Sequence, residues 1–341
     1  MTISAVDLFC GVGGLTHGLQ QSGVKVTAGY DTDAYCQLPY EANNEAQFLN
    51  QDVSELSAED LNKHYDETKI RLLAGCAPCQ PFSKYTQALP RDERWGLLYH
   101  FGRLAIELRP ELITMENVPE LDRHEVFAEF VKTLTDQGYR VWHRVVFCPD
   151  YGVPQNRKRL VLLASLLGEV ELIPATHSKD EYVTLKEAIG SLPRLQAGKT
   201  NKDDPLHRCA NLSDINLKRI KASKPGGTWK DWPTELQAAC HKRDSGKKYT
   251  SVYGRLKWSE PSPTITTQFY NYGSGRYGHP TQARALSLRE AAVLQSFPKD
   301  YKFTEAGEDY SITNISRMIG NAVPVALGKA IGDSLLKHIK A

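Results

Sequence analysis

Cys79 is the residue in this sequence whose type and surroundings point most directly to chemistry. It lies in segment 75–83, which reads GCAPCQPFS and follows the apolar segment 70–74. A short apolar segment that ends in glycine is typical of a buried strand in a parallel sheet, and such sheets bind ligands at the carboxyl ends of their strands. Prolines on both sides of Cys79 hold the backbone dihedral φ near about −65°. The thiol is therefore expected to project from a stiff loop.

Three interpretations of Cys79 are open at this point. A cysteine in a reduced protein is commonly a buried structural thiol. Together with Cys76 it forms a C-x-x-C pair, which can be a dithiol site or part of a zinc site. It can also be a covalent nucleophile. Because the sequence has no second C-x-x-C pair and no closely spaced histidine pair to complete a tetrahedral site, we expect no metal.

Acidic residues follow further strand-like segments near the N-terminus. Segment 3–9 is apolar and leads into CGVGGL at 10–15 and then a helical pattern. Glycines between a strand and a helix let the backbone approach a ligand beside the helix N-terminus. Segment 24–30 ends at Asp31, where a carboxylate can accept hydrogen bonds from ribose hydroxyls, and Asp52 follows another short apolar pair. Each acid alone is more typical of a surface position, but their succession favours a cofactor that contains a nucleoside.

Glu116 and two arginines complete the candidate catalytic residues. The apolar segment 112–115 predicts a strand that ends in Glu116, and a carboxyl group at a strand's end is a candidate proton donor or acceptor. Arg157 and Arg159 lie two positions apart, a spacing that projects both side chains to one side of an extended strand. The two arginines could clamp a phosphate or a base carbonyl. A charge pair on an edge strand explains them equally well without further context.

Regular alternation of elements places these residues in an α/β domain. Helical apolar stripes at 96–108 and 125–137 are followed by strand-like segments at 139–147 and 160–165. Strands that alternate with helices predict a mostly parallel sheet.

The character of the sequence changes after about residue 166. Helical periodicity fades, glycine, proline and lysine become frequent, and segments 251–258 and 264–270 are candidates for short strands. Periodicity returns at 288–294, and the chain ends in an amphipathic helix. We predict a first domain at 1–168, a smaller irregular, β-containing domain at 169–309, and a C-terminal segment at 310–341 that returns to the first domain.

Charge is distributed unevenly along the chain. The 341 residues have a formal net charge of +2, whereas segment 199–258 carries 14 Lys and Arg against 6 Asp and Glu, a net charge of +8. A basic segment on an otherwise mildly acidic chain indicates a region that binds a polyanion, and a solvated, loop-rich subdomain is the alternative. No apolar segment approaches the roughly 20 residues that span a bilayer. The seven cysteines are scattered, so we expect a reduced, cytoplasmic protein without membrane contact.

Taken together and in order, these segments resemble the motifs of the cytosine-C5 DNA methyltransferases of prokaryotic or phage type. The similar segments are DLFCGVGGL at 7–15, PCQPFS at 78–83, ENV at 116–118, Q-x-R-x-R at 155–159, RALSLREAA with LQ-x-FP at 284–298, and GNAVP at 320–324. They extend over nearly the whole chain outside a variable region at about 166–260. Cys10 stands where the family usually has Ser or Ala, and Asp31 where it usually has Glu.

The resemblance implies a Rossmann-like, S-adenosylmethionine-dependent enzyme that methylates C5 of a cytosine flipped out of duplex DNA. Cys79 would add to C6 of the base, and Glu116 would stabilise the activated ring. Arg159 would contact the base carbonyl, and Arg157 would support the loop. The implied cofactor contacts are Phe9, Gly11, Gly14, Asp31, Thr32, Asp52, Pro78, Leu98, Asn321 and Val323, and the implied DNA contacts are Gln80, Ser83 and Thr264.

The resemblance also implies roles and partners. The first domain would bind the cofactor and carry out catalysis, and the second would recognise the target sequence in duplex DNA. S-adenosylhomocysteine would be the product, and no metal would be required. We expect a monomer in the cytoplasm of a prokaryotic cell or a phage-infected host, acting beside a separate cognate restriction endonuclease or as an orphan methylase.

Three rival functions stay open. A transfer RNA methylase on the same scaffold typically carries a Cys-Phe-Thr tripeptide, which this sequence lacks. A DNA-binding regulator with a vestigial catalytic domain would not need the full set of polar catalytic residues. A dithiol oxidoreductase would use Cys76 together with Cys79, and the substitution Cys76→Ser would abolish its activity.

Overall fold

The chain folds into two compact units. The computed structural model describes residues 2–66, 69–78, 92–305 and 310–340. The first unit comprises residues 1–152, 157–178 and 322–341, and the second comprises residues 153–156 and 179–321. The domain boundaries predicted after residues 168 and 309, and the roles assigned to the domains, stay predictions.

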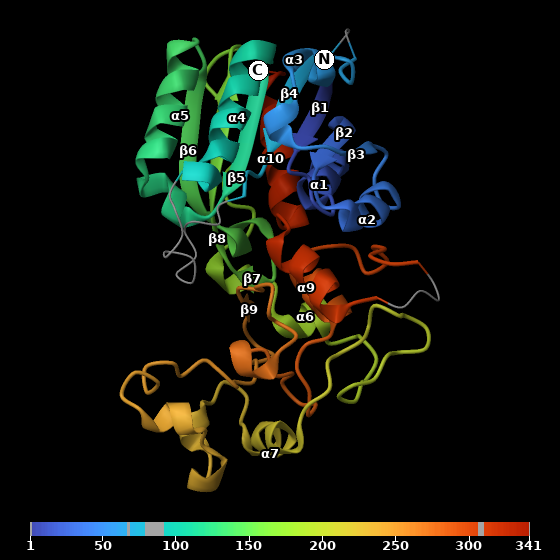
Figure 1. Ribbon diagram of the computed structural model, residues 1–341, viewed down its shortest axis with the longest axis vertical. Helices are drawn as coiled ribbons and strands as arrows, with labels where there is room; N and C mark the ends of the chain where they lie inside the picture. Colours follow the sequence, from blue (N-terminus) through green and yellow to red (C-terminus); the bar gives the residue numbers. More distant parts are fainter. Residues whose placement is uncertain (1, 67–68, 79–91, 306–309, 341) are drawn as a thin grey trace. The chain divides into compact units, whose positions relative to one another are not determined.

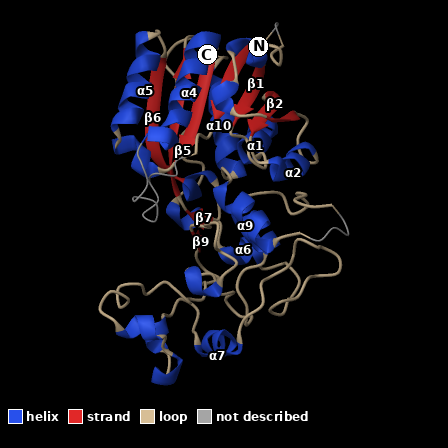
Figure 2. Cartoon of the chain, in the orientation of Figure 1, coloured by secondary structure: helices blue, strands red, loops and turns tan. Residues whose placement is uncertain are grey.

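A twisted sheet forms the centre of the first unit (Figures 1 and 2). In its described part seven strands are arranged in the order β3-β2-β1-β4-β5-β8-β6, and β8 alone runs antiparallel to its neighbours. The strands are β1 (Ile3–Leu8), β2 (Lys25–Asp31), β3 (Gln47–Asn50), β4 (Ile70–Gly75), β5 (Leu112–Asn117), β6 (Arg140–Phe147) and β8 (Lys158–Ser165). The prediction of a mostly parallel α/β sheet is confirmed.

Helices cover both faces of this sheet. Strand order reverses between β1 and β4, and because crossover connections are right-handed, α1 and α4 lie on opposite faces. In Figure 1, α5 lies beside α4, and α10 packs against α1. The helices of this unit are α1 (Gly14–Ser22), α2 (Gln37–Glu41), α3 (Ala58–Asn62), α4 (Asp92–Leu108), α5 (Glu125–Asp136) and α10 (Val325–His338).

Close helix packing and an apolar core hold the first unit together. A Cβ atom at Gly18 of α1 would overlap the carbonyl oxygen of Val325 in α10, so these two backbones meet directly. Between the sheet and α4 and α5, Phe101 and Phe130 pack with ring centroids 5.7 Å apart within the main apolar cluster. Truncating one buried phenylalanine of such a core costs about 3–5 kcal/mol. The cluster therefore fixes where the strand ends lie.

The second unit is mostly loops and short helices. It contains the two-residue strands β7 (Gln155–Asn156) and β9 (Ser262–Pro263) and the helices α6 (Leu185–Ile189), α7 (Asp214–Ala222), α8 (Leu288–Leu294) and α9 (Ile312–Asn321). Helix α8 was predicted at these residues, whereas α9 was not.

The strands predicted at 251–258 and 264–270 are wrong. In the first segment only Arg255 takes part in pairing, through isolated bridges to Pro225 and Gly278. In the second, the backbone N–H of Ile265 donates to the side-chain oxygen of Gln155 at 2.7 Å, and residues 267–270 form a turn. β-Propensity was therefore overridden in this second segment, where a side chain and not a neighbouring strand accepts the hydrogen bond of the Ile265 N–H.

Candidate active site at the carboxyl ends of the strands

The reversal of strand order between β1 and β4 creates the candidate site. In open α/β sheets, ligands bind in the crevice outside the carboxyl ends of the strands at this point. Residues predicted for the site lie at, or just after, the carboxyl ends of five of the strands. They are Phe9 and Gly11 after β1, Asp31 at the end of β2, Asp52 after β3, Pro78 after β4, and Glu116 in β5.

The loop after β1 has a backbone that glycine favours. Phe9, Gly11 and Gly13 adopt φ values of 58°, 51° and 83°, which lie in the left-handed region that side chains disfavour. The N–H of Cys10 donates to the carbonyl of Tyr30 at 3.1 Å, which ties the loop to β2. A Cβ atom at Gly11 would meet no described atom within 4 Å. The loop therefore borders open space into which a ligand can fit.

Asp31 joins the ends of β1 and β2. Its Oδ2 atom accepts a hydrogen bond from the N–H of Gly11 at 2.9 Å, and its Oδ1 atom accepts one from the N–H of Asp33 at 2.9 Å. Thr32 is exposed next to it. At the end of β3, Asp52 accepts a hydrogen bond from the N–H of Ser54 at 2.8 Å, which lowers the pKa of its carboxyl group. Two anchored carboxylates thus follow β2 and β3, as the sequence predicted.

Gly14 and Val323 meet although 309 positions separate them in the sequence. A Cβ atom at Gly14 would overlap the carbonyl oxygen of Val323, so only glycine permits this approach. Val323 precedes α10 and is buried. The contact places two predicted cofactor residues side by side at the N-terminus of α1. The open space at Gly11 and the nearby Asp31 carboxylate fit a group that contains a nucleoside.

A buried carboxylate that the sequence analysis did not select lies under this loop. Asp7 of β1 is inaccessible to solvent, and burial raises the pKa of its carboxyl group to about 7. Its Oδ2 atom accepts a hydrogen bond from the Thr16 hydroxyl at 2.7 Å, and the Tyr40 hydroxyl lies 3.1 Å from that of Thr16. Its Oδ1 atom has no hydrogen-bond partner among the described residues. The sequence did contain a signal for this residue, because Asp7 is a single carboxylate within the apolar segment 3–9.

Glu116 is held between two side chains. Only 2% of the residue is exposed. The Nε atom of Arg159 lies 2.8 Å from its Oε1 atom, and the Cys76 thiol donates to its Oε2 atom at 3.0 Å. The structure thus brings Glu116 and Arg159 together, as expected for a shared site. Cys76, which the sequence analysis considered only as a redox or metal residue, makes the other contact.

The segment that leads to Cys79 is anchored to the end of β5. The side-chain amide of Asn117 donates to the carbonyl of Ala77 at 3.0 Å, and its oxygen accepts from the N–H of Val118 at 2.8 Å. Pro78 is exposed at the end of this described segment. Cys79 lies outside the described residues, as do Gln80 and Ser83.

Arg157 and Arg159 differ in exposure. Arg157 is 2% exposed, and burial, followed by the charge of Arg159, lowers the pKa of its guanidinium group to about 9. Its carbonyl accepts a hydrogen bond from the N–H of Cys148 at 2.8 Å. The Arg159 side chain is 13% exposed and reaches Glu116. Arg157 is therefore placed to support the turn before β8, and Arg159 to act beside the carboxylate.

Three predicted residues have other surroundings. Leu98 of α4 is 6% exposed and belongs to the apolar cluster under the sheet. Asn321 is exposed at the end of α9, within the second unit. Thr264, also in the second unit, donates its hydroxyl hydrogen to the carbonyl of Asn156 at 2.8 Å. Their assigned ligand contacts stay predictions.

The turn at Thr264 and Ile265 is supported from within the second unit. Gln155 is fully buried, and besides accepting from Ile265 it donates to the carbonyl of Leu294 at 3.0 Å and to the side chain of Gln295 at 2.8 Å. The first residue of the Q-x-R-x-R motif thus connects this turn to helix α8.

An aromatic cluster organises the basic part of the second unit. Trp229 stacks on His241 with ring centroids 4.2 Å apart, and the guanidinium of Arg219 lies over the rings of Trp232 and Tyr253. Burial lowers the pKa of His241, so this ring packs in its neutral form. The surrounding chain carries the excess of lysine and arginine noted above.

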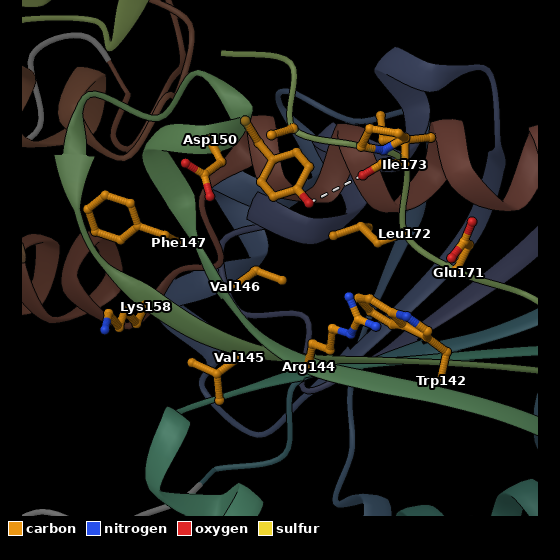
Figure 3. A pocket seen from close by; sticks show the side chains of 13 residues that line it. Trp142, Arg144, Val145, Val146, Phe147, Asp150, Lys158, Glu171, Leu172 and Ile173 are labelled. Carbon is orange, nitrogen blue, oxygen red and sulfur yellow. Dashed lines mark hydrogen bonds between the residues drawn. The ribbon is translucent and has the colours of Figure 1, made fainter. Parts of the chain in front are cut away.

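A separate cleft of about 510 Å³ lies along the edge strand β6 (Figure 3). Trp142, Arg144 and Lys158 line it, and the Tyr151 hydroxyl donates to the carbonyl of Ile173 at 3.3 Å across it. Its lining includes none of the residues predicted for catalysis or cofactor binding. This cleft is therefore not the candidate active site.

Two kinds of feature are absent from the described residues. No group of three or more His, Cys, Asp or Glu side chains could hold a metal ion there. None of the described helices is long and apolar enough to cross a membrane.

The chain is similar to a known family and to known proteins over nearly its whole length. The family model described as C-5 cytosine-specific DNA methylase matches residues 3–337. The Type II methylase M.HgiDII of Herpetosiphon aurantiacus is 50% identical over 100% of this chain and 97% of its own length. The Type II methyltransferase M1.HphI of Haemophilus parahaemolyticus is 32% identical over 99% of this chain and 87% of its own length.

Solved structures share the fold. A protein assigned as a DNA modification methyltransferase, encoded within an E. coli prophage, superposes with a TM-score of 0.76 at 23% identity. The Dnmt2 methyltransferase of S. pombe superposes with a TM-score of 0.69 at 16% identity. Each comparison covers 100% of both chains.

Proposed function

This chain belongs to the C-5 cytosine-specific DNA methylase family, and from that premise we propose which of its residues carry out the reaction and on what substrate. Membership makes it a DNA methyltransferase that depends on S-adenosylmethionine. We propose that it methylates a cytosine within a short, specific sequence of duplex DNA.

The observation that carries the proposal is the surroundings of Glu116. A carboxylate that is 2% exposed, with a guanidinium 2.8 Å from one oxygen, sits at the strand ends where the Cys79 segment begins. Burying a charged group costs desolvation free energy unless the group is paired, and buried titratable groups of this kind cluster at functional sites. This pair offers what a pyrimidine edge requires, namely an acidic group for the ring nitrogen and amine and a cation for the carbonyl.

We assign the steps as follows. The Cys79 thiolate adds to C6 of cytosine, and the electron pair of the C5–C6 double bond makes C5 nucleophilic. Glu116 holds a proton at N3 and accepts a hydrogen bond from the exocyclic amine, while Arg159 contacts the base carbonyl. S-adenosylmethionine would supply an electrophilic methyl group, which C5 captures as the S–CH₃ bond breaks and S-adenosylhomocysteine leaves. Loss of the C5 proton to water then restores the double bond and expels Cys79.

The cofactor would be held along the ends of β1, β2 and β3. The open space at Gly11 leaves room for it, and the Asp31 and Asp52 carboxylates would accept hydrogen bonds from its ribose and amine groups. Phe9, Thr32, Pro78, Leu98, Asn321 and Val323 are the further proposed contacts. No step requires a metal.

The DNA contacts are assigned to both units. A cytosine inside a duplex is unreachable, so the target must be flipped out at a cost of a few kcal/mol. The basic segment 199–258 would offset this cost by binding phosphates. Gln80 and Ser83 are further proposed DNA contacts, and the turn at Thr264 would contact bases in the major groove.

The biological setting follows from the relatives. M.HgiDII and M1.HphI are named as Type II enzymes, and we propose that this chain likewise protects DNA in a restriction-modification system. It would act as a monomer, separately from a cognate endonuclease, or as an orphan methylase in the cytoplasm.

The decisive experiment measures transfer of labelled methyl groups to duplex DNA, with transfer RNA as a parallel substrate. Cys79→Ser should abolish transfer and leave cofactor binding nearly intact, and Glu116→Gln should lower kcat by about 10²-fold or more. Duplex DNA that carries 5-fluorocytosine should trap the wild-type enzyme as an adduct at position 79. Retained turnover in Cys79→Ser, an adduct elsewhere, or methylation of transfer RNA alone would refute the assignment.

A further inference from the structure

The thiol of Cys76 faces the proposed catalytic carboxylate because of the register of the sheet. Strands β4 and β5 are parallel and pair Gly75 with Met115, so the next residues along, Cys76 and Glu116, are neighbours on the same face. The N–H of Cys76 donates to the carbonyl of Leu8 at 3.2 Å and thereby extends the pairing of β4 with β1. The position of the thiol is thus set by backbone pairing on both sides.

The two oxygens of the Glu116 carboxylate have different partners. Arg159 lies 2.8 Å from Oε1, and the Cys76 thiol lies 3.0 Å from Oε2. A carboxyl group can turn about its last side-chain bond unless a directional contact holds it. The contact at Oε1 is an ion pair without hydrogen-bond geometry, whereas the thiol donates a hydrogen bond to Oε2, so the orientation of the group toward a base depends on the thiol.

Cys76 makes this contact as a neutral donor. Burial, followed by the negative charge of Glu116, raises the pKa of its thiol well above the usual range, although Arg159 opposes the shift. The other charged or titratable groups that act on this pair are Arg157 before β8, Cys148 after β6 and Asp7 in β1. The thiol is the group that donates to Oε2 of Glu116.

We propose that Cys76 is a positioning residue that orients Glu116 and tunes its proton affinity through a weak thiol hydrogen bond. This inference rests on the proposed role of Glu116. A thiol is a weaker donor than a hydroxyl, and every hydrogen bond to a carboxylate favours its ionised form. A thiol can therefore hold the carboxylate in place and still let it keep a proton at the base, whereas a hydroxyl there would hold the ionised form more firmly.

The inference predicts opposite effects for two substitutions. Cys76→Ala removes the donor, so kcat should fall by about tenfold with little change in KM, and the limb of the kcat–pH profile that depends on Glu116 should move to higher pH. Cys76→Ser supplies a stronger donor, so most of kcat should return while the same limb moves to lower pH. A side chain that only fills space would not move the limb in either variant.

A double-mutant cycle isolates the route of the effect. In a Glu116→Gln background, Cys76→Ala should produce no further loss of the residual kcat, because the thiol acts through the carboxylate. Cys209→Ala is the matched control, since Cys209 is a buried thiol that donates to the carbonyl of Gln196 at 3.2 Å in the second unit. It should lose stability without a change in the position of the pH profile.

The outcomes separate the two proposals. Absence of methyl transfer by the wild-type enzyme, or an unchanged kcat in Glu116→Gln, would overturn the proposed function itself. An active wild-type enzyme and an impaired Glu116→Gln variant, together with Cys76→Ala and Cys76→Ser profiles that coincide with the wild type, would overturn the inference about Cys76 alone. Thermal unfolding of each variant shows whether it is folded. If Cys76→Ala does not fold, the Glu116-dependent limb of the kcat–pH profile of Cys76→Ser decides whether the inference holds.

Discussion

Replacing Asp7 with asparagine should make the protein more stable at neutral and alkaline pH. The carboxyl group of Asp7 is fully buried, and desolvation opposes its ionisation more strongly than the Thr16 hydroxyl favours it. Asparagine has nearly the same shape as a protonated aspartic acid, and its oxygen can still accept the hydrogen bond from Thr16. The substitution therefore removes the charge and retains the contact.

The magnitude follows from the shift in pKa. The value rises from 3.8, appropriate to the unfolded chain, to about 7 in the folded protein. Between these two pH values the unfolded chain releases the proton and the folded protein keeps it, so stability falls as pH rises and levels off above pH 7. At about 1.4 kcal/mol for each pKa unit, the loss is about 4 kcal/mol.

Urea unfolding of the wild type and of Asp7→Asn at several pH values tests this. The free energy of unfolding of the variant minus that of the wild type should increase by about 4 kcal/mol between pH 4 and pH 8, with most of the change below pH 7. Asp136→Asn, at an exposed position on α5, is the control for an aspartate that stays in contact with solvent. A constant difference for Asp7→Asn would show that this carboxyl group is not desolvated.

Two further substitutions test packing and a buried ion pair. Gly14→Ala should lower the free energy of unfolding by more than about 2 kcal/mol and weaken S-adenosylmethionine binding in calorimetry, because its Cβ atom would overlap a backbone carbonyl. Gly96→Ala in α4 is the control. The nearest atom to its Cβ lies 3.9 Å away, so this substitution should be neutral or stabilising. Glu290→Gln should lower the unfolding free energy by about 3–5 kcal/mol, since it leaves the buried Arg284 guanidinium without its carboxylate. Burial opposes ionisation of Glu290, but Arg284 outweighs it and lowers the pKa of this carboxyl group to about 2. The contribution of Glu290 to stability is therefore present above pH 4.5 and is lost as pH falls toward 2. Denaturation curves whose midpoints are unaffected by the substitution would contradict this.

Local patterns in the sequence were enough to predict the strands and the longer helices of the first unit. Every residue of β1 and β5 is buried, and a continuous apolar segment between glycine or proline residues is the signal of such strands. Apolar stripes likewise predicted α5 and α8, because helices repeat every 3.6 residues. The same rules failed at 251–258 and 264–270, where turns and side-chain hydrogen bonds replace strand pairing.

The candidate site was predictable as a set of residues and not as an arrangement. Motif order selected Glu116 and Arg159, but their 2.8 Å contact exists because β8 runs antiparallel to β5 and pairs Val161 with Glu116. The contact between Cys76 and Glu116 depends in the same way on the register of β4 with β5. Nothing in the neighbouring sequence reports such a register, since it results from many weak contacts between distant segments.

The amino-acid sequence by itself determined the strands and longer helices of the first unit, the strand ends that bear polar side chains and the family to which the chain is similar. Those properties depend on residues close together in the chain. The tertiary structure decided that Asp7 would be buried beneath the glycine loop and that a thiol would hold one oxygen of Glu116. Burial and hydrogen bonding of this kind depend on which distant segments pack together. They in turn set the pKa of the Asp7 carboxyl group and of the Cys76 thiol.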